Sequence, residues 1–231
     1  MKTYKQATDR DAYRQLYIND THVKLRPVRD FFRKLRGASG FLPKTFRALS
    51  QHPRYQRVEQ EIARRGFKRV LDVGCSTGMV SILLGHRLGV SVTGVDISPI
   101  HVAKAKALNW VSSVSFHEVF AEDLGQFAPP ASFDCILFLE LLEHVMNVEE
   151  ILTAVSPLLA PGGLVLITLP NDEDVHEQSH QHVREFDEEE IRRTFGRFPE
   201  FHYEAIPAVP GVYAGGHFVR FAFSRAHVAD E

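Results

Sequence analysis

The sequence has few cysteines and no long apolar run. Only two of its 231 residues are cysteines, Cys75 and Cys135, too few for a disulfide framework or a four-cysteine zinc site. Apolar runs of about 18 residues are missing, so we expect no membrane span. The first residues, MKTYKQATDRD, lack the apolar core of a secretory signal. We therefore expect a cytoplasmic protein.

The composition fits a folded domain with an uneven charge. Hydrophobic residues make up 44%, charged residues 24% and aromatic residues 10%, which excludes wholesale disorder. Residues 1–52 carry 12 Lys and Arg against 4 Asp and Glu, whereas residues 53–231 carry 15 against 25. We interpret residues 1–52 as a basic helical cap or arm on a domain formed by residues 53–231. The arm is either solvated or a flap for an anionic substrate or nucleic acid, and it could mediate a homodimer.

Helical and strand patterns alternate from residue 53 onward. We predict helices over 53–65, 79–88, 99–108, 148–159 and 188–195. We predict strands over 68–73, 91–95, 114–118, 133–139 and 164–169, and two more near 200–207 and 217–224. This alternation predicts a doubly wound α/β fold with a mostly parallel sheet. The last two strands have no helix between them, so we expect an antiparallel hairpin at one edge.

A glycine-containing turn, VLDVGCSTG (70–78), joins a strand to a helix. Such turns let backbone amides approach a ligand closely. A dinucleotide fingerprint needs glycine at the first, third and sixth positions, but counting from Gly74 these last two are Ser76 and Met79. Asp72 would repel a pyrophosphate and suit a cationic ligand. Asp96 ends the next strand, where a carboxylate can accept both hydroxyls of a ribose.

Five segments together resemble the class I S-adenosylmethionine-dependent methyltransferases. They are VLDVGCSTG, VTGVDIS (92–98), FAEDL (120–124), FDCILFLELLEHV (133–145) and LAPGGLVLITLPN (159–171). The resemblance covers about residues 53–224 and implies a Rossmann-like, seven-stranded sheet with a reversed last strand. It also implies S-adenosylmethionine as the cofactor, bound by Asp72, Gly74, Cys75, Ser76, Gly78, Asp96, Ile97, Ala121, Glu122 and Leu139.

The resemblance also assigns roles within this cofactor set. Asp72 and the 74–78 backbone would hold the methionine part, Asp96 the ribose, and Ile97 the adenine face. The chain departs from the family at two positions. Ser76 stands where glycine is common, and Phe120 where an aspartate often precedes the Ala-Glu pair. Adenine would therefore be held by stacking or by a backbone amide rather than by that carboxylate.

Glutamate and histidine side chains follow the fourth predicted strand. On a helical turn, Glu140 would share a face with Glu143 and His144. The loop after the fifth strand adds His176, His180 and His182. Because ligands of open α/β sheets bind at the carboxyl ends of the strands, we expect these groups to border the methyl group of the cofactor.

Three interpretations of this cluster remain open. His144, with Glu140 and His182, could form a catalytic group in which an imidazole removes a proton from a hydroxyl. Alternatively, Glu140, Glu143, His144 and His182 could bind a divalent cation. That pattern resembles the metal site of the small-RNA 3′-end 2′-O-methyltransferases and is similar to one in the ubiquinone-pathway O-methyltransferases. The third interpretation is purely structural.

We predict a methyltransferase that acts on a hydroxyl of a small-molecule acceptor. An RNA 2′-O-methyltransferase is the alternative within the same fold, although the basic arm matches no nucleic-acid-binding module. A non-catalytic nucleoside-binding protein is the second alternative, because fold does not determine function.

Overall fold

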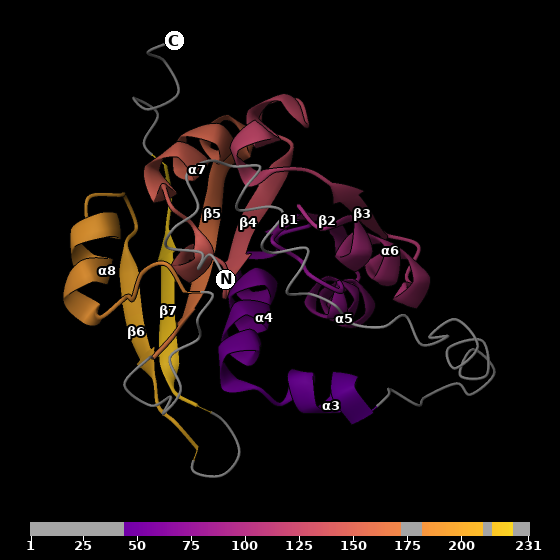
Figure 1. The fold of residues 1–231 in the computed structure, drawn as a ribbon, viewed down its shortest axis with the longest axis horizontal. Coiled ribbons are helices and arrows are strands. Elements are labelled where there is room, and N and C mark those ends of the chain that lie inside the picture. Colours follow the sequence, from indigo (N-terminus) through magenta and orange to yellow (C-terminus); the bar gives the residue numbers. More distant parts are fainter. Residues whose placement is uncertain (1–43, 172–181, 210–213, 224–231) are drawn as a thin grey trace, which may run out of the picture.

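A seven-stranded sheet forms the centre of the protein (Figure 1). The computed structural model describes residues 44–171, 182–209 and 214–223. The strands are β1 (Arg69–Val73), β2 (Ser91–Asp96), β3 (Val114–Glu118), β4 (Phe133–Leu139), β5 (Leu159–Pro170), β6 (His202–Ile206) and β7 (Gly216–Phe221). The helices are α3 (Lys44–Ser50), α4 (Pro53–Arg65), α5 (Met79–Leu88), α6 (Pro99–Leu108), α7 (Val148–Val155) and α8 (Glu188–Phe195). Short 3-10 helices are η2 (Ala121–Gln126), η3 (Leu142–His144) and η4 (Ser156–Leu158).

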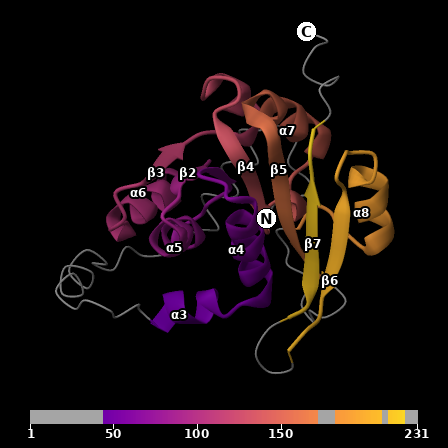
Figure 2. The same cartoon turned by 180° about the vertical axis from the view of Figure 1, so that it is seen from behind.

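The strand order confirms the predicted doubly wound fold with an antiparallel edge. The order is β3-β2-β1-β4-β5-β7-β6, with parallel pairing from β3 to β5. β7 runs antiparallel to both β5 and β6, so the last strand lies inside the sheet and β6 forms the edge (Figure 2).

The side chains of the central strands point alternately into two hydrophobic cores, one on each face of the sheet. Val70 packs with α4 and α5, whereas its neighbour Leu71 packs with α7 and α8. The same alternation separates Leu137 from Ile136 on β4. Successive strand residues point to opposite faces, so strands covered on both sides read as continuous apolar runs.

Most predicted elements are confirmed, but α7 and β5 differ from expectation. α7 ends at Val155 rather than at residue 159. Pro157 has no N–H to continue the helix, and the Ser156 hydroxyl instead donates to the Thr153 carbonyl at 3.1 Å. β5 begins at Leu159 rather than at residue 164 because an irregularity in the β4–β5 pairing lengthens it, and Gly162 adopts a φ of 79° there.

Part of the predicted arm packs on the domain. Phe46 of α3 is buried and meets Trp110 edge-on, with ring centroids 5.0 Å apart. Residues 1–43, which hold most of the arm, and the histidines His176 and His180 lie outside the described residues. Within the described ranges, the helices are too short or too polar to cross a membrane.

Candidate active site

A cavity of about 530 Å³ opens at the carboxyl ends of β1, β2, β3 and β4. The sheet reverses its winding between β1 and β4, and ligands of doubly wound sheets bind at such a switch point. Nine of the ten predicted cofactor residues line it: Asp72, Gly74, Cys75, Ser76, Asp96, Ile97, Ala121, Glu122 and Leu139. The topology thus brings together residues from four separate strand ends.

The turn after β1 is bonded to the end of β2. The amides of Gly74 and Cys75 both donate to the Val95 carbonyl, at 2.8 and 2.9 Å. The Ser76 amide donates to Asp96 Oδ2 at 2.8 Å. We expected these amides to approach a ligand, but they already donate within the protein. Gly74 is nevertheless required, because it has a φ of 75° and a Cβ there would lie 2.8 Å from Leu141 Cδ1.

Gly78 is the predicted cofactor residue that does not line the cavity. It precedes α5 with a φ of 74°. A Cβ on Gly78 would lie 2.6 Å from Phe116 Cε1 and 2.9 Å from Ala105 Cβ. Its position is therefore explained by packing of the turn against β3 and α6.

Asp72 is a buried carboxyl in the cavity wall. Only 2% of its surface is exposed, and the Ser81 hydroxyl donates to it. Burial raises the pKa of Asp72 to about 7, and the charge of Asp96 acts in the same direction. A cationic ligand beside it would favour the ionised form. Burial also raises the pKa of the Cys75 and Cys135 thiols, so both keep their protons near neutral pH.

Asp96 ends β2 and faces the same cavity. Its Oδ2 accepts the Ser76 amide and its Oδ1 accepts the Ser98 amide, both at 2.8 Å. These two bonds fix the orientation of the carboxylate. Each oxygen of an ionised carboxylate can accept a second hydrogen bond, which leaves capacity for two ligand hydroxyls.

The predicted glutamate–histidine cluster divides into two parts. Glu143, His144 and His182 offer ligand atoms that all lie within 4.8 Å of one another. Glu140 is not a member of this group. Its φ is 54°, it precedes η3, and its Oε2 lies 2.7 Å from Arg54 Nη1. The expectation that Glu140 shares a helical turn with Glu143 and His144 is therefore not met.

Glu143, His144 and His182 lie close together in two segments that are joined by a backbone hydrogen bond. His144 lines the cavity, and its ring centroid is 4.9 Å from that of His182. His144 Nε2 is 4.0 Å from Glu143 Oε1, and Glu143 is only 2% exposed. The Glu143 carbonyl accepts the Val183 amide at 2.9 Å, so the backbone holds the two segments together.

The first turn of α4 supplies two residues that sequence reasoning missed. Arg54 Nη1 donates to Glu140 and also to the Leu169 carbonyl, at 3.2 Å. Tyr55 lines the cavity beside Asp72 and Glu140. Burial, together with the charge of Glu140, raises the pKa of Tyr55 to about 12. No motif marks these residues, because Arg54 and Glu140 are 86 positions apart in the chain.

Comparison with known proteins identifies the family and the fold. A family model described as a methyltransferase domain matches residues 45–203. The chain belongs to the methyltransferase domain family. A ubiquinone biosynthesis O-methyltransferase of Dechloromonas aromatica is 40% identical over 116 residues, which are 49% of each chain. The chain thus spans about half the length of the curated relatives it matches.

Solved structures of other proteins have the same fold. The YcgJ protein of Bacillus subtilis has a TM-score of 0.58 at 18% identity, covering 74% of this chain and 98% of that one. A SAM-dependent methyltransferase from Archaeoglobus fulgidus has a TM-score of 0.55 at 15% identity, covering 72% and 93%. The predicted Rossmann-like methyltransferase fold is confirmed.

Proposed function

We propose that the protein binds S-adenosylmethionine in this cavity and transfers its methyl group to a hydroxyl of a small-molecule acceptor. The observation that carries the proposal is the convergence of Asp72, Asp96 and His144 on one cavity. The family match and the O-methyltransferase names of the curated relatives support the same reaction class.

The residues present fit this cofactor. Asp72 offers a buried carboxylate for the ammonium group, and Asp96 offers two oriented oxygens for the ribose hydroxyls. Ile97 and Ala121 provide apolar wall for the adenine, while Phe120 lines the cavity nearby. The volume of about 530 Å³ lies in the range of small-molecule sites. When bound, S-adenosylmethionine supplies a methyl group activated by its positive sulfur.

His144 is our proposed proton acceptor. The imidazole would accept the proton of the acceptor hydroxyl, whose oxygen would take the methyl group that the cofactor supplies. Glu143 lies 4.0 Å away and would stabilise the resulting positive charge. The roles predicted for Glu140 and His182 are then indirect: Glu140 orders the end of β4 through Arg54, and His182 packs against the His144 ring.

A metal-assisted reaction is the second candidate, and the compact Glu143–His144–His182 group favours it. One carboxylate and two imidazoles suit a divalent cation and would leave positions for acceptor oxygens. We included Glu140 in the predicted metal set, but its carboxylate forms an ion pair with Arg54 instead. The RNA alternative also uses a metal, but residues 1–43, which carry most of the basic arm, lie outside the described ranges.

Labelled S-adenosylmethionine added to a cell extract, with and without a chelator, tests these proposals. Label in the small-metabolite fraction is expected, whereas label only in RNA or protein would contradict the acceptor class. His144→Gln should lower kcat by roughly 100-fold or more while leaving cofactor affinity unchanged. His202→Gln, on the exposed edge strand β6, is the matched control and should keep full activity. Loss of activity with the chelator, restored by added metal, would make His144 a ligand rather than a base.

A further inference from the structure

Tyr55 occupies a fixed position where α4 meets the cavity. Beside it, Arg54 ties the start of α4 to the ends of β4 and β5, through Glu140 and the Leu169 carbonyl. The His52 ring lies against Tyr55, with centroids 5.0 Å apart. Burial lowers the pKa of His52 to about 4, so this neighbour is uncharged near neutral pH.

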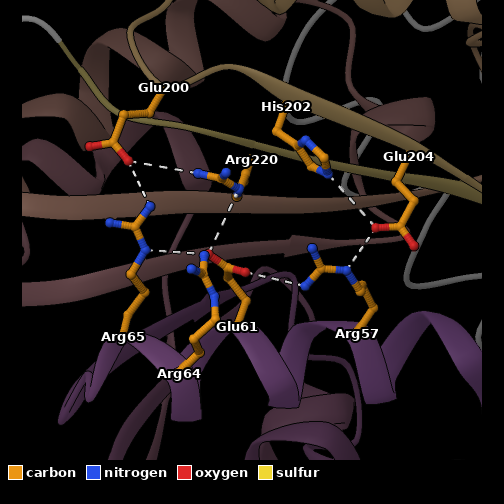
Figure 3. A network of polar contacts seen from close by, with 8 residues as sticks. All are labelled: Arg57, Glu61, Arg64, Arg65, Glu200, His202, Glu204 and Arg220. Carbon is orange, nitrogen blue, oxygen red and sulfur yellow. Dashed lines mark hydrogen bonds and ion pairs between the residues drawn. The ribbon is translucent and has the colours of Figure 1, made fainter.

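A second set of contacts holds the other half of α4 (Figure 3). Glu61 is fully buried and lies 2.6 Å from Arg64 and 3.2 Å from Arg57. Arg57 reaches Glu204 of β6 at 2.7 Å, and Arg65 reaches Glu200 at 2.7 Å. α4 is therefore anchored along its length, so the Tyr55 side chain is positioned by the protein before any ligand binds.

Tyr55 brings a hydroxyl group to the cavity wall. Within the described ranges it makes no hydrogen bond to a side chain or to the backbone. Burial and the charges of Glu140, Asp72 and Glu143 raise the pKa of this hydroxyl, whereas the charge of Arg54 lowers it. In these surroundings the hydroxyl keeps its proton, so it can donate a hydrogen bond but cannot serve as a base.

We propose that the Tyr55 hydroxyl donates a hydrogen bond to the oxygen of the methyl acceptor, an inference that rests on the proposed function. α4 is bonded to the ends of β4 and β5, whereas the groups suited to the cofactor, Asp72 and Asp96, belong to β1 and β2. Tyr55 and His144 both line the cavity, and both belong to segments next to the end of β4.

This donor indicates a class of acceptor. A hydrogen bond to an oxygen that is losing its proton stabilises the ionised form. Tyr55 as donor and His144 as proton acceptor would together suit an acidic hydroxyl, such as that of a phenol or a catechol. An aliphatic hydroxyl is a far weaker acid, so an imidazole near neutral pH would deprotonate it much less readily.

Tyr55→Phe tests the inference, because it removes the hydroxyl and keeps the ring. The full-length variant is assayed with S-adenosylmethionine and a panel of simple phenols and catechols. We expect kcat/KM for the acceptor to fall roughly tenfold, as for the loss of one buried hydrogen bond. Cofactor affinity, measured by calorimetry, should stay at the wild-type value. Tyr203→Phe is the matched control: it removes a hydroxyl 3.1 Å from His217 Nδ1 on the antiparallel hairpin and should leave kcat/KM unchanged.

The experiment separates a failure of the proposed acceptor class from a failure of the proposed role of Tyr55. If the wild-type protein methylates no member of the panel, the proposed acceptor class fails and this inference with it. If the wild-type protein is active and Tyr55→Phe equals it, only the role of Tyr55 is overturned. A variant that loses cofactor affinity in proportion to kcat/KM would assign the hydroxyl to the cofactor, which also overturns the inference.

Discussion

Replacing Gly78 by alanine should destabilise the protein far more than the size of one methyl group suggests. Gly78 has a φ of 74°, and a residue with a Cβ is strained in this region by about 1 to 2 kcal/mol. The new Cβ would also lie 2.6 Å from Phe116 Cε1, and Phe116 is only 2% exposed. Overpacking of this kind costs about 1 to 3 kcal/mol. The free energy of unfolding should therefore fall by about 2 to 5 kcal/mol.

Gly89→Ala is the control for this experiment. Gly89 follows the other end of the same helix, α5, with a φ of 65°, and a Cβ there would meet no atom within 4 Å. It should show the backbone strain alone, about 1 to 2 kcal/mol. Urea denaturation of both variants measures the difference. Equal destabilisation would refute the argument that Gly78 is required by its contact with Phe116.

Two further predictions concern buried carboxyl groups. The pKa of Asp72 in the folded protein is about 7, above its ordinary value of 3.8. The protonated carboxyl therefore favours the folded, ligand-free protein. This stabilisation is complete below pH 4 and is lost as the pH rises through 7. Between pH 4 and pH 8, the free energy of unfolding of Asp72→Asn should therefore rise by on the order of 4 kcal/mol relative to that of the wild type. If urea denaturation shows a difference between the two proteins that does not vary with pH, Asp72 is not protonated in the folded protein. Glu61→Ala should cost about 3 kcal/mol by leaving its arginines without their buried partner. Glu204→Ala, with 40% of its side chain exposed, should cost less than about 1 kcal/mol in the same assay.

The fold could be predicted because its signals are local. Apolar runs marked the central strands. The side chains of Asn147 and Asp187 accept hydrogen bonds from the amides of Glu150 and Glu190 at the starts of α7 and α8, and both residue types favour this position. The sheet edge was predicted from the missing helix between the last strands. The β5 boundary was missed because the early pairing of Leu159 with Phe133 depends on a partner strand rather than on its own sequence.

The candidate site could be predicted only in part, for a related reason. Spacing identified Gly74 and Gly78 as turn glycines, and both have positive φ values. Spacing could not show what approaches them, and the structure places Leu141 over Gly74 and Phe116 over Gly78. Both neighbours come from later segments of the chain. A glycine motif therefore predicts a conformation reliably and a ligand contact much less so.

Glu140 forms an ion pair with Arg54, a residue that belongs to none of the sequence motifs. Its sequence context predicts a group shared with Glu143 and His144, yet Arg54 holds its carboxylate at 2.7 Å. That contact joins the start of α4 to the end of β4 and so sets where Tyr55 enters the cavity. In the function we propose, local strand–turn motifs would form the cofactor half of the site, whereas the acceptor half would depend on how α4 packs against the sheet. Differences in acceptor among proteins of this fold should therefore arise in α4 and its contacts more than in the glycine turn.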